Sequence, residues 1–458
     1  MEYSRSEIMN GVWLTHLRTD KFKTACISVT LLTQLRRETA AMNALIPLVL
    51  RRGTALCGDM EAISRRLDEL YGAAVEPVVR RIGEIQCLGF IASAPEDEML
   101  PEGSRVLEGE CSLLGQLLLS PKTRGGLLKP EYVDSEREKL VDLIRSRVND
   151  KLSYSLQRCI EEMCCCEDYA VGRLGDEESA EAIRYQKLTK QYRELIRTSP
   201  IEIFYCGRAD RRRVEGLMRD ALATAPRGEI DEDIGTDVRM NALEDKPRVR
   251  REEMAVSQGK LVVGWRLGEC MEEPDPAALR VFVSLYGGSA MSKLFVNVRE
   301  KLSLCYYASA IADIHKGTLF AYAGTEFADA ERAADEIVAQ LESVARGEIS
   351  PEELQAAKSD VISALRSSLD SQVDLEGFFL SAAVDGLELQ PEELCALVED
   401  VTAEDVAAIA AGCECDMIYF LTGSGEEDGG GGGEAEELSD TDGLLSEEAE
   451  SEDGENDI

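Results

Sequence analysis

The chain has 458 residues, of which 44% are hydrophobic and 30% are charged, a balance typical of a globular protein with two or three domains. The formal net charge is -38; residues 424–458 carry 15 acidic and no basic side chains, which leaves -23 on residues 1–423. Both parts repel phosphate, and no basic stripe with interleaved aromatic residues offsets this. The composition therefore argues against a nucleic-acid partner and favours a protein or peptide partner.

The N-terminus lacks the basic start and apolar core of a secretory signal, and no apolar run approaches the roughly 20 residues that span a bilayer. We therefore expect a cytoplasmic protein with no membrane partner. In a long chain of this kind, most of the 14 cysteines are expected to be reduced core residues. Cys164, Cys165 and Cys166 are consecutive, and adjacent side chains on a helix point in different directions, so they form a poor tetrahedral metal cage.

The local patterns alternate between strand and helix along the chain. An amphipathic helix is predicted from Met60 to Leu70, with Asp59 as its N-cap and Gly72 as its stop. β-Rich runs of strand length occur at residues 22–33, 82–92, 259–267 and 317–325.

A weak internal repeat is the most informative feature of these patterns. A shift of 235 positions places residues 48–56 on 283–291, and it superposes Gly53 on Gly288 and Tyr71 on Tyr306. Both copies read as an apolar segment, a glycine turn, an amphipathic helix and a tyrosine that opens the next segment. The segments 200–207 and 416–423 also resemble each other, at an offset of 216.

The repeat predicts an α+β fold with two similar domains, each a mainly antiparallel sheet packed against helices. The segment K-P-R-V-R-R-E-E near residue 250 is typical of an exposed linker. The glycine-rich, acidic C-terminal segment has too few apolar residues to offset its ordering entropy, so we expect a disordered tail. The predicted boundaries are 1–225 for the first domain, 226–253 for the linker, 254–423 for the second domain and 424–458 for the tail.

The segment from Gly287 to Ser309 reads G-G-S-A-M-S-K-L-F-V-N-V-R-E-K-L-S-L-C-Y-Y-A-S. It resembles the second-domain signature of the insulinase and pitrilysin (M16) metallopeptidase family, in which a glycine-rich turn and S-x-L-F-x-x-x-R-E-K precede G-L-x-Y. In this chain Ser303 replaces the glycine of that last element. The resemblance covers nearly all of residues 1–423 and implies two homologous insulinase-type domains.

The catalytic members of that family carry an inverted zinc motif, H-x-x-E-H, on a helix of the first domain. Two histidines four residues apart share one helical face and bind zinc, and the glutamate activates the bound water. The resemblance places these three positions at Ala44, Pro47 and Leu48, and the third ligand position, a glutamate in the family, at Leu143. None of the four residues is a metal ligand, so we expect no metal in this chain and no catalysis by the chain alone.

Other chemistry has little support in the sequence. A shift of one residue would place Asp142 at the third ligand position, but one carboxylate does not hold zinc. The only histidines, His16 and His315, lie far apart in different copies of the repeat, and we interpret each as a surface or core histidine. No G-x-S-x-G or P-loop motif occurs, and nothing places a histidine beside a cysteine.

In active family members the second domain contributes an arginine that donates to a carbonyl of the substrate peptide and a tyrosine whose hydroxyl stabilises the oxyanion. The resemblance places these roles on Arg299 and Tyr306, and both residue types are present. The alternative is a structural role, with Arg299 paired to Glu300 or another acid and Tyr306 packed at a domain face.

Several enzymes of this family are heterodimers of a zinc-bearing subunit and a metal-free subunit that supplies the arginine and tyrosine. The sequence resembles the metal-free kind, in particular the short bacterial YfmF-like group that is associated with aminopentanol modification of elongation factor P. The first hypothesis is therefore a non-catalytic subunit for peptide processing, a pseudoenzyme whose heterodimer partner alone holds zinc. The alternatives are an inert peptide-binding scaffold and a metallopeptidase with a displaced metal site.

Overall fold

The computed structural model describes residues 1–423, and the predicted acidic tail lies outside the described residues. Contacts divide the chain into two units, and each unit includes a short segment from the other half of the chain. Unit 1 consists of Met1–Ser146, Val171–Gly235 and Asp370–Glu388. Unit 2 consists of Arg147–Ala170, Thr236–Leu369 and the described residues from Leu389 onward. The contiguous domain boundaries expected from the sequence stay a prediction.

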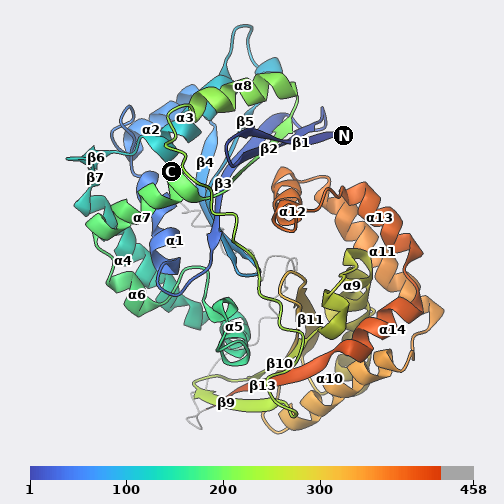
Figure 1. Cartoon of the computed structure of the whole chain (residues 1–458). Coiled ribbons are helices and arrows are strands. Elements are labelled where there is room, and N and C mark those ends of the chain that lie inside the picture. Colours follow the sequence, from blue (N-terminus) through green and yellow to red (C-terminus); the bar gives the residue numbers. More distant parts are fainter. Residues whose placement is uncertain (424–458) are drawn as a thin grey trace, which may run out of the picture. The chain divides into compact units, whose positions relative to one another are not determined.

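Unit 1 is built on a six-stranded sheet with the order β1-β2-β8-β3-β5-β4 (Figure 1). Its strands are β1 Glu2–Met9, β2 Val12–Arg18, β3 Thr24–Gln34, β4 Ala74–Ile82, β5 Ile85–Pro95 and β8 Ile201–Gly207. Every pair is antiparallel except β2 with β8. The predicted run 82–92 begins too early, because Gly83, at φ +54°, lies in the turn between β4 and β5.

The helices of unit 1 bury the apolar face of this sheet. Helices α1 and α7 contact each other and lie along one face, where α1 meets β5 and α7 meets β3 (Figure 1). The predicted helix after Asp59 is confirmed, since the Asp59 carboxylate accepts the Ala62 N–H at 2.9 Å. The elements are α1 Ala40–Leu50, α2 Met60–Glu69, α3 Val106–Leu119, α4 Pro130–Ser146, α6 Glu177–Glu181, α7 Tyr185–Thr198 and α8 Arg211–Ala221, with a small hairpin of β6 Thr123–Arg124 and β7 Leu127–Leu128.

Unit 2 is built on a five-stranded sheet with the order β11-β12-β10-β13-β9. Its strands are β9 Arg248–Met254, β10 Gly259–Arg266, β11 Tyr307–Asp313, β12 Thr318–Thr325 and β13 Glu414–Gly423. The end of the expected linker is therefore a strand, because β9 pairs in parallel with β13. The charged sequence R-V-R-R-E-E-M had suggested an exposed linker, but charged residues are also common on edge strands.

The remaining helices surround or join these sheets. They are α5 Lys151–Met163, α9 Pro276–Val283, α10 Ala330–Ala345, α11 Pro351–Ser368, α12 Gln372–Val384, α13 Pro391–Asp400 and α14 Ala403–Gly412. Two π-helical turns follow α9, at Ser284–Gly288 and Leu294–Lys301. None of the helices in residues 1–423 combines the length and the apolar character needed to cross a bilayer.

The two sheets show the repeat directly. The order β2-β8-β3-β5-β4 in unit 1 matches β9-β13-β10-β12-β11 in unit 2, and the parallel pairs correspond as well. The predicted α+β fold with two homologous domains is therefore confirmed. Helices α5 and α12 hold equivalent places in the repeat, yet α5 packs on β10 and β13, whereas α12 packs on β8 and β3. By its contacts, α5 therefore belongs to unit 2 although it lies in the first half of the chain. Helix α12 belongs to unit 1 although it lies in the second half.

Candidate functional site

The four zinc-motif positions expected from the family resemblance, three for ligands and one for the general base, lie on α1 and α4, two helices that pack against each other. Ala44 has no exposed surface and belongs to the core of unit 1. Leu48 packs against the same core and is partly buried, while Leu143 is 41% exposed. This part of unit 1 is apolar packing and offers no ligand atom from these side chains.

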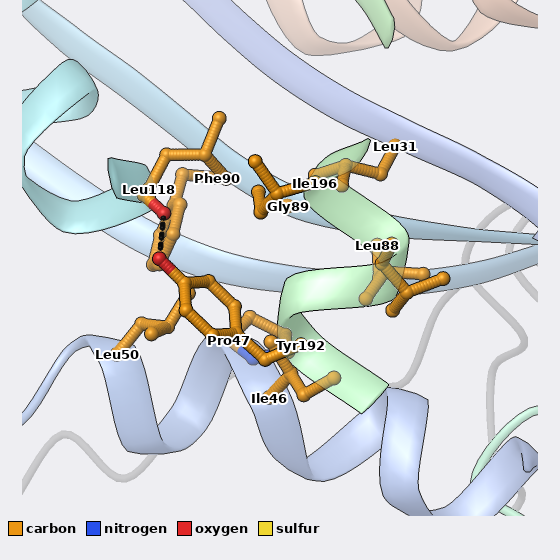
Figure 2. A pocket seen from close by; sticks show the side chains of 11 residues that line it. Leu31, Ile46, Pro47, Leu50, Leu88, Gly89, Phe90, Leu118, Tyr192 and Ile196 are labelled. Atoms are coloured by element: carbon orange, nitrogen blue, oxygen red, sulfur yellow. Dashed lines mark hydrogen bonds between the residues drawn. The ribbon is translucent and has the colours of Figure 1, made fainter. Parts of the chain in front are cut away.

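Pro47, at the position expected for the family's general base, lies inside α1 and does not end it. The helix continues beyond it, and the Pro47 carbonyl accepts the Arg51 N–H at 3.0 Å. Pro47 borders an apolar cavity of about 10 Å³ that Tyr192 and Phe90 also line (Figure 2). The Tyr192 hydroxyl donates to the Leu118 carbonyl at 2.8 Å. The cavity is no larger than the space for one water molecule, so it has no room for a substrate.

Other possible ligands do not gather near these positions. Asp142 is exposed on α4, and its carboxylate lies 3.9 Å from the Arg145 guanidinium. His16 is buried in β2, stacks on Tyr205 and donates from Nε2 to the Ala209 carbonyl at 3.0 Å; its burial lowers the pKa of His16. His315 lies in unit 2. Within residues 1–423, no three His, Cys, Asp or Glu side chains come close enough to hold a metal ion.

Arg299 lies on the π-helical turn Leu294–Lys301 of unit 2. Its guanidinium carbon lies 4.6 Å from the centroid of the Phe295 ring, a cation–π distance. Its Nε lies 3.7 Å from the Glu300 carboxylate, so the structural pairing expected for this arginine is present but is longer than a hydrogen bond. The Arg299 side chain remains 39% exposed and can reach other groups.

Tyr306 immediately precedes β11, and 51% of its surface is exposed. Its N–H donates to the Gly324 carbonyl of β12 at 2.8 Å, so the backbone of Tyr306 continues the pairing between β11 and β12. Its hydroxyl donates to the Glu326 carboxylate, and this hydrogen bond raises the pKa of Tyr306. The phenol is therefore protonated at neutral pH and can act as a hydrogen-bond donor.

A left-handed turn connects the two residues. Ser303, where the family has glycine, adopts φ +50°, a conformation that favours glycine. Its N–H donates to the Arg299 carbonyl at 3.1 Å, and the Leu304 N–H donates to the Val298 carbonyl at 3.1 Å. This turn ends the π-helical segment and directs the chain into Tyr306 and β11. It fixes the backbone positions of Arg299 and Tyr306 relative to each other.

Other residues of the family motif serve packing. The Lys293 ammonium donates to the Glu348 carbonyl at 2.7 Å and lies 2.7 Å from the Glu353 carboxylate at the start of α11. Asn297 donates to Gln340 on α10 at 2.6 Å. These contacts hold the π-helical turn against two helices, so part of the motif reflects structure rather than chemistry.

Sequence reasoning missed a buried charge cluster in unit 2. Arg266, Lys316, Glu167 and Asp416 are almost completely buried and pair with one another. Lys316 lies 2.7 Å from Glu167, and Arg266 contacts both acids at 2.6 and 3.0 Å. The only signal was Arg266 at the end of an apolar strand, because its partners are distant in sequence.

Comparison with known proteins identifies the family. A family model described as "Peptidase M16 inactive domain" matches residues 182–361. The Bacillus subtilis (strain 168) protein "Probable inactive metalloprotease YmfF" is 30% identical over 412 residues, which cover 89% of this chain and 95% of that protein. This chain belongs to the peptidase M16 family. It is an inactive M16 homologue, as the sequence predicted.

Solved structures support the M16 assignment at the level of the fold. A conserved protein from Enterococcus faecalis V583 matches with a TM-score of 0.83 at 25% identity. The match covers 93% of this chain and 100% of the Enterococcus chain. A peptidase M16 inactive domain from Pseudomonas fluorescens has a TM-score of 0.73 at 15% identity, with 93% and 98% covered. The association of M16 homologues like this one with elongation factor P stays a prediction.

Proposed function

We propose that this M16 homologue is a non-catalytic subunit that pairs with a zinc-bearing M16 protein and contributes Arg299 and Tyr306 to a shared peptide-processing site. The observation that carries this proposal is a contrast within the chain. The four positions that the family resemblance assigns to the zinc motif, three ligands and the general base, are apolar, whereas Arg299 and Tyr306 are partly exposed and joined by a defined turn.

The chemistry expected of the two residues is complementary. A guanidinium offers a planar set of donors that can hold a peptide carbonyl, and a phenol donates one hydrogen bond to a developing oxyanion. The Tyr306 hydroxyl already donates to Glu326, so it would have to exchange this carboxylate for the substrate. Zinc would be supplied only by the partner subunit, and the pair would act in the cytoplasm.

A peptide substrate could also bind as an added strand. The strand β10 resembles an inner strand of the family's second domain, but β12 and β13 pair with both of its edges. The strand β11 instead lies at the edge of its sheet and begins directly after Tyr306. Its backbone would therefore be the better acceptor for an extended peptide.

A peptide-binding scaffold without a catalytic partner is the second candidate. It is favoured by the contacts of Arg299 with Phe295 and Glu300 and of Tyr306 with Glu326, which occupy both side chains within the chain itself. A displaced metal site has no such support, because residues 1–423 contain no cluster of three ligands.

The test is reconstitution of the full chain with a zinc-bearing M16 protein from the same organism. We expect analytical ultracentrifugation to show a heterodimer and metal analysis to find zinc only in the partner. Peptide cleavage should require both subunits. A partner that cleaves at the same rate alone, together with no complex at micromolar concentration, would overturn the proposal; peptide binding by this chain alone would then favour the scaffold.

A further inference from the structure

The turn that follows α5 presents two neighbouring thiols to solvent. Cys164 is buried in the core of unit 2, whereas Cys165 and Cys166 are exposed. All 14 cysteines lie within residues 1–423, and the other 12 are buried or partly buried. The two exposed sulfur atoms lie 3.8 Å apart. The three consecutive cysteines thus separate into one core residue and one exposed dithiol.

The sulfur–sulfur distance suits chelation better than a disulfide. Two thiolates bound at about 2.3 Å to one centre, with an angle of about 95–110° between the two bonds, lie about 3.4–3.8 Å from each other. A disulfide requires a sulfur separation of about 2.0 Å and usually joins Cα atoms about 4.4–6.8 Å apart. Adjacent Cα atoms are only about 3.8 Å apart across a trans peptide bond, so closure to a disulfide would be strained.

One arginine lies beside the turn that carries this dithiol. The Arg248 guanidinium donates to the Glu162 and Met163 carbonyls at 3.0 and 2.9 Å, and it pairs with Asp416 at 2.7 Å. Cationic neighbours and partial exposure are the surroundings in which cysteines react as thiolates.

The backbone holds the dithiol in place. The Cys164 N–H donates to the Ile160 carbonyl at 2.8 Å, and the Glu167 N–H donates to the Cys164 carbonyl at 2.8 Å. Glu167 is in turn fixed by the buried cluster, where it lies 2.6 Å from Arg266 and 2.7 Å from Lys316. The turn therefore has anchored ends, and the two exposed side chains need little reorganisation to bind one atom.

We propose that Cys165 and Cys166 form a two-thiolate site for a soft, thiophilic ion or metalloid, with trivalent arsenic as the defining example. Soft centres prefer thiolate ligands, and trivalent arsenic can be held by two of them. Zinc prefers four protein ligands in a structural site, and residues 1–423 place no third ligand group beside this pair. The site is independent of any partner subunit and of Arg299 and Tyr306.

The binding reaction with the probe phenylarsine oxide is balanced and involves no oxidant. Two arsenic–sulfur bonds form, the arsenic–oxygen bond breaks, and the two thiol protons leave in one molecule of water. Arsenic stays trivalent throughout. The protein therefore gains the mass of phenylarsine oxide less one water and loses two reactive thiols.

The experiment titrates the reduced full-length chain with phenylarsine oxide in the presence of excess glutathione. Intact-mass measurement should show one adduct per chain, and peptide mapping should place it on Cys165 and Cys166. Cys165→Ser and Cys166→Ser should each weaken the adduct by roughly 10²-fold or more, because a single thiol lacks the second, linked bond. Cys395→Ser, which removes a partly buried thiol on α13, is the matched control and should bind normally.

Three results would overturn the proposal. The first is an adduct that persists in both serine variants, which would place arsenic elsewhere. The second is rapid closure of the pair to a disulfide under mild oxidation with no arsenical binding. The third is retention of one zinc per chain that both serine variants lose, which would show a site with further ligands.

Discussion

The guanidinium of Arg266 binds both carboxylate oxygens of Glu167, with Nη2 to Oε1 at 2.6 Å and Nη1 to Oε2 at 3.1 Å. Arg266 lies on β10, whereas Glu167 follows α5 in the first half of the chain. Lys316 adds a third hydrogen-bonding group to the same carboxylate. The contact therefore fastens the segment 147–170 to the sheet of unit 2.

Glu167→Ala should lower the free energy of unfolding by about 3–5 kcal/mol, because the two buried cations Arg266 and Lys316 lose the carboxylate that both contact. Urea denaturation would measure this loss. The matched control is Glu161→Gln, which removes a partly exposed partner of Arg158 and should cost less than about 1 kcal/mol. Equal effects of the two changes would mean that the buried cluster does not hold the segment.

The same cluster predicts a direction for acid sensitivity. Burial opposes ionisation of Glu167, but hydrogen bonds from Arg266 and Lys316 outweigh it and hold the pKa of Glu167 below its usual range. The stabilisation is therefore present above the unfolded pKa, about 4.3, and is lost as the pH falls through the folded value.

Glu110 on α3 should destabilise the protein at alkaline pH. Burial raises the pKa of Glu110 well above its usual range, and neither carboxylate oxygen has a hydrogen-bond partner in residues 1–423. Because the folded pKa is raised, its contribution is most favourable below pH about 4.3 and declines as the pH rises toward the folded value. Glu110→Met should raise the free energy of unfolding by roughly 1–3 kcal/mol at pH 8 and by less at pH 5.

Denaturation curves at both pH values test this, with Glu108→Gln as the control. Glu108 lies on the same helix with an exposed side chain, so its variant should show no such pH-dependent difference. A Glu110→Met gain that is equal at pH 5 and pH 8 would contradict the assigned protonation.

Ser303→Gly should stabilise the protein by up to about 1 kcal/mol. A left-handed residue other than glycine costs about 1–2 kcal/mol, and the greater freedom of glycine in the unfolded chain offsets part of the gain. Thermal unfolding would detect the shift. Ser289→Gly is the matched comparison and should destabilise, because Ser289 has an extended backbone at φ -132°. A destabilised Ser303→Gly would show that the turn is not strained.

Tyr306→Phe should lower peptide turnover by the reconstituted heterodimer about 10²- to 10³-fold with little change in KM, because one oxyanion donor is lost. Arg299→Lys should raise KM as well, since the planar fork is lost. Tyr71→Phe is the control, because Tyr71 is the repeat equivalent of Tyr306 and is equally exposed, at 51%. Wild-type cleavage by correctly assembled Tyr306 and Arg299 variants would assign both residues a structural role.

Restoring the zinc motif should not produce an enzyme. Ala44→His inserts an imidazole where no surface is exposed, and overpacking of this kind typically costs about 1–3 kcal/mol. Leu143→Glu alone lies at an exposed position and should change stability by less than about 0.5 kcal/mol. We expect the combined variant, with Pro47→Glu and Leu48→His, to melt at a lower temperature and to show no zinc-dependent cleavage. Tight binding of zinc together with zinc-dependent peptide cleavage by the combined variant would refute this prediction.

Local sequence patterns were sufficient for much of the fold. The apolar runs at 22–33, 259–267 and 317–325 became β3, β10 and β12, and Asp59 caps α2, because alternation and capping depend on neighbouring residues. The absence of zinc-ligand residues was also predictable from the sequence, because the family resemblance assigns the ligand positions and the sequence shows which residues occupy them. The roles of Arg299 and Tyr306 rest on family resemblance and stay predictions.

Long-range packing determined the features that no local pattern revealed. The assignment of α5 and α12 to opposite units, the pairing of β9 with β13 and the buried cluster around Glu167 each depend on which distant surfaces meet. From sequence alone, a charged segment is expected to be exposed to solvent, because its counter-charge lies on a distant element. The sequence of an amphipathic helix likewise does not specify which sheet the helix covers. The exposure of Cys165 and Cys166 beside a buried Cys164 follows from the same cause, because burial is a property of the packed chain.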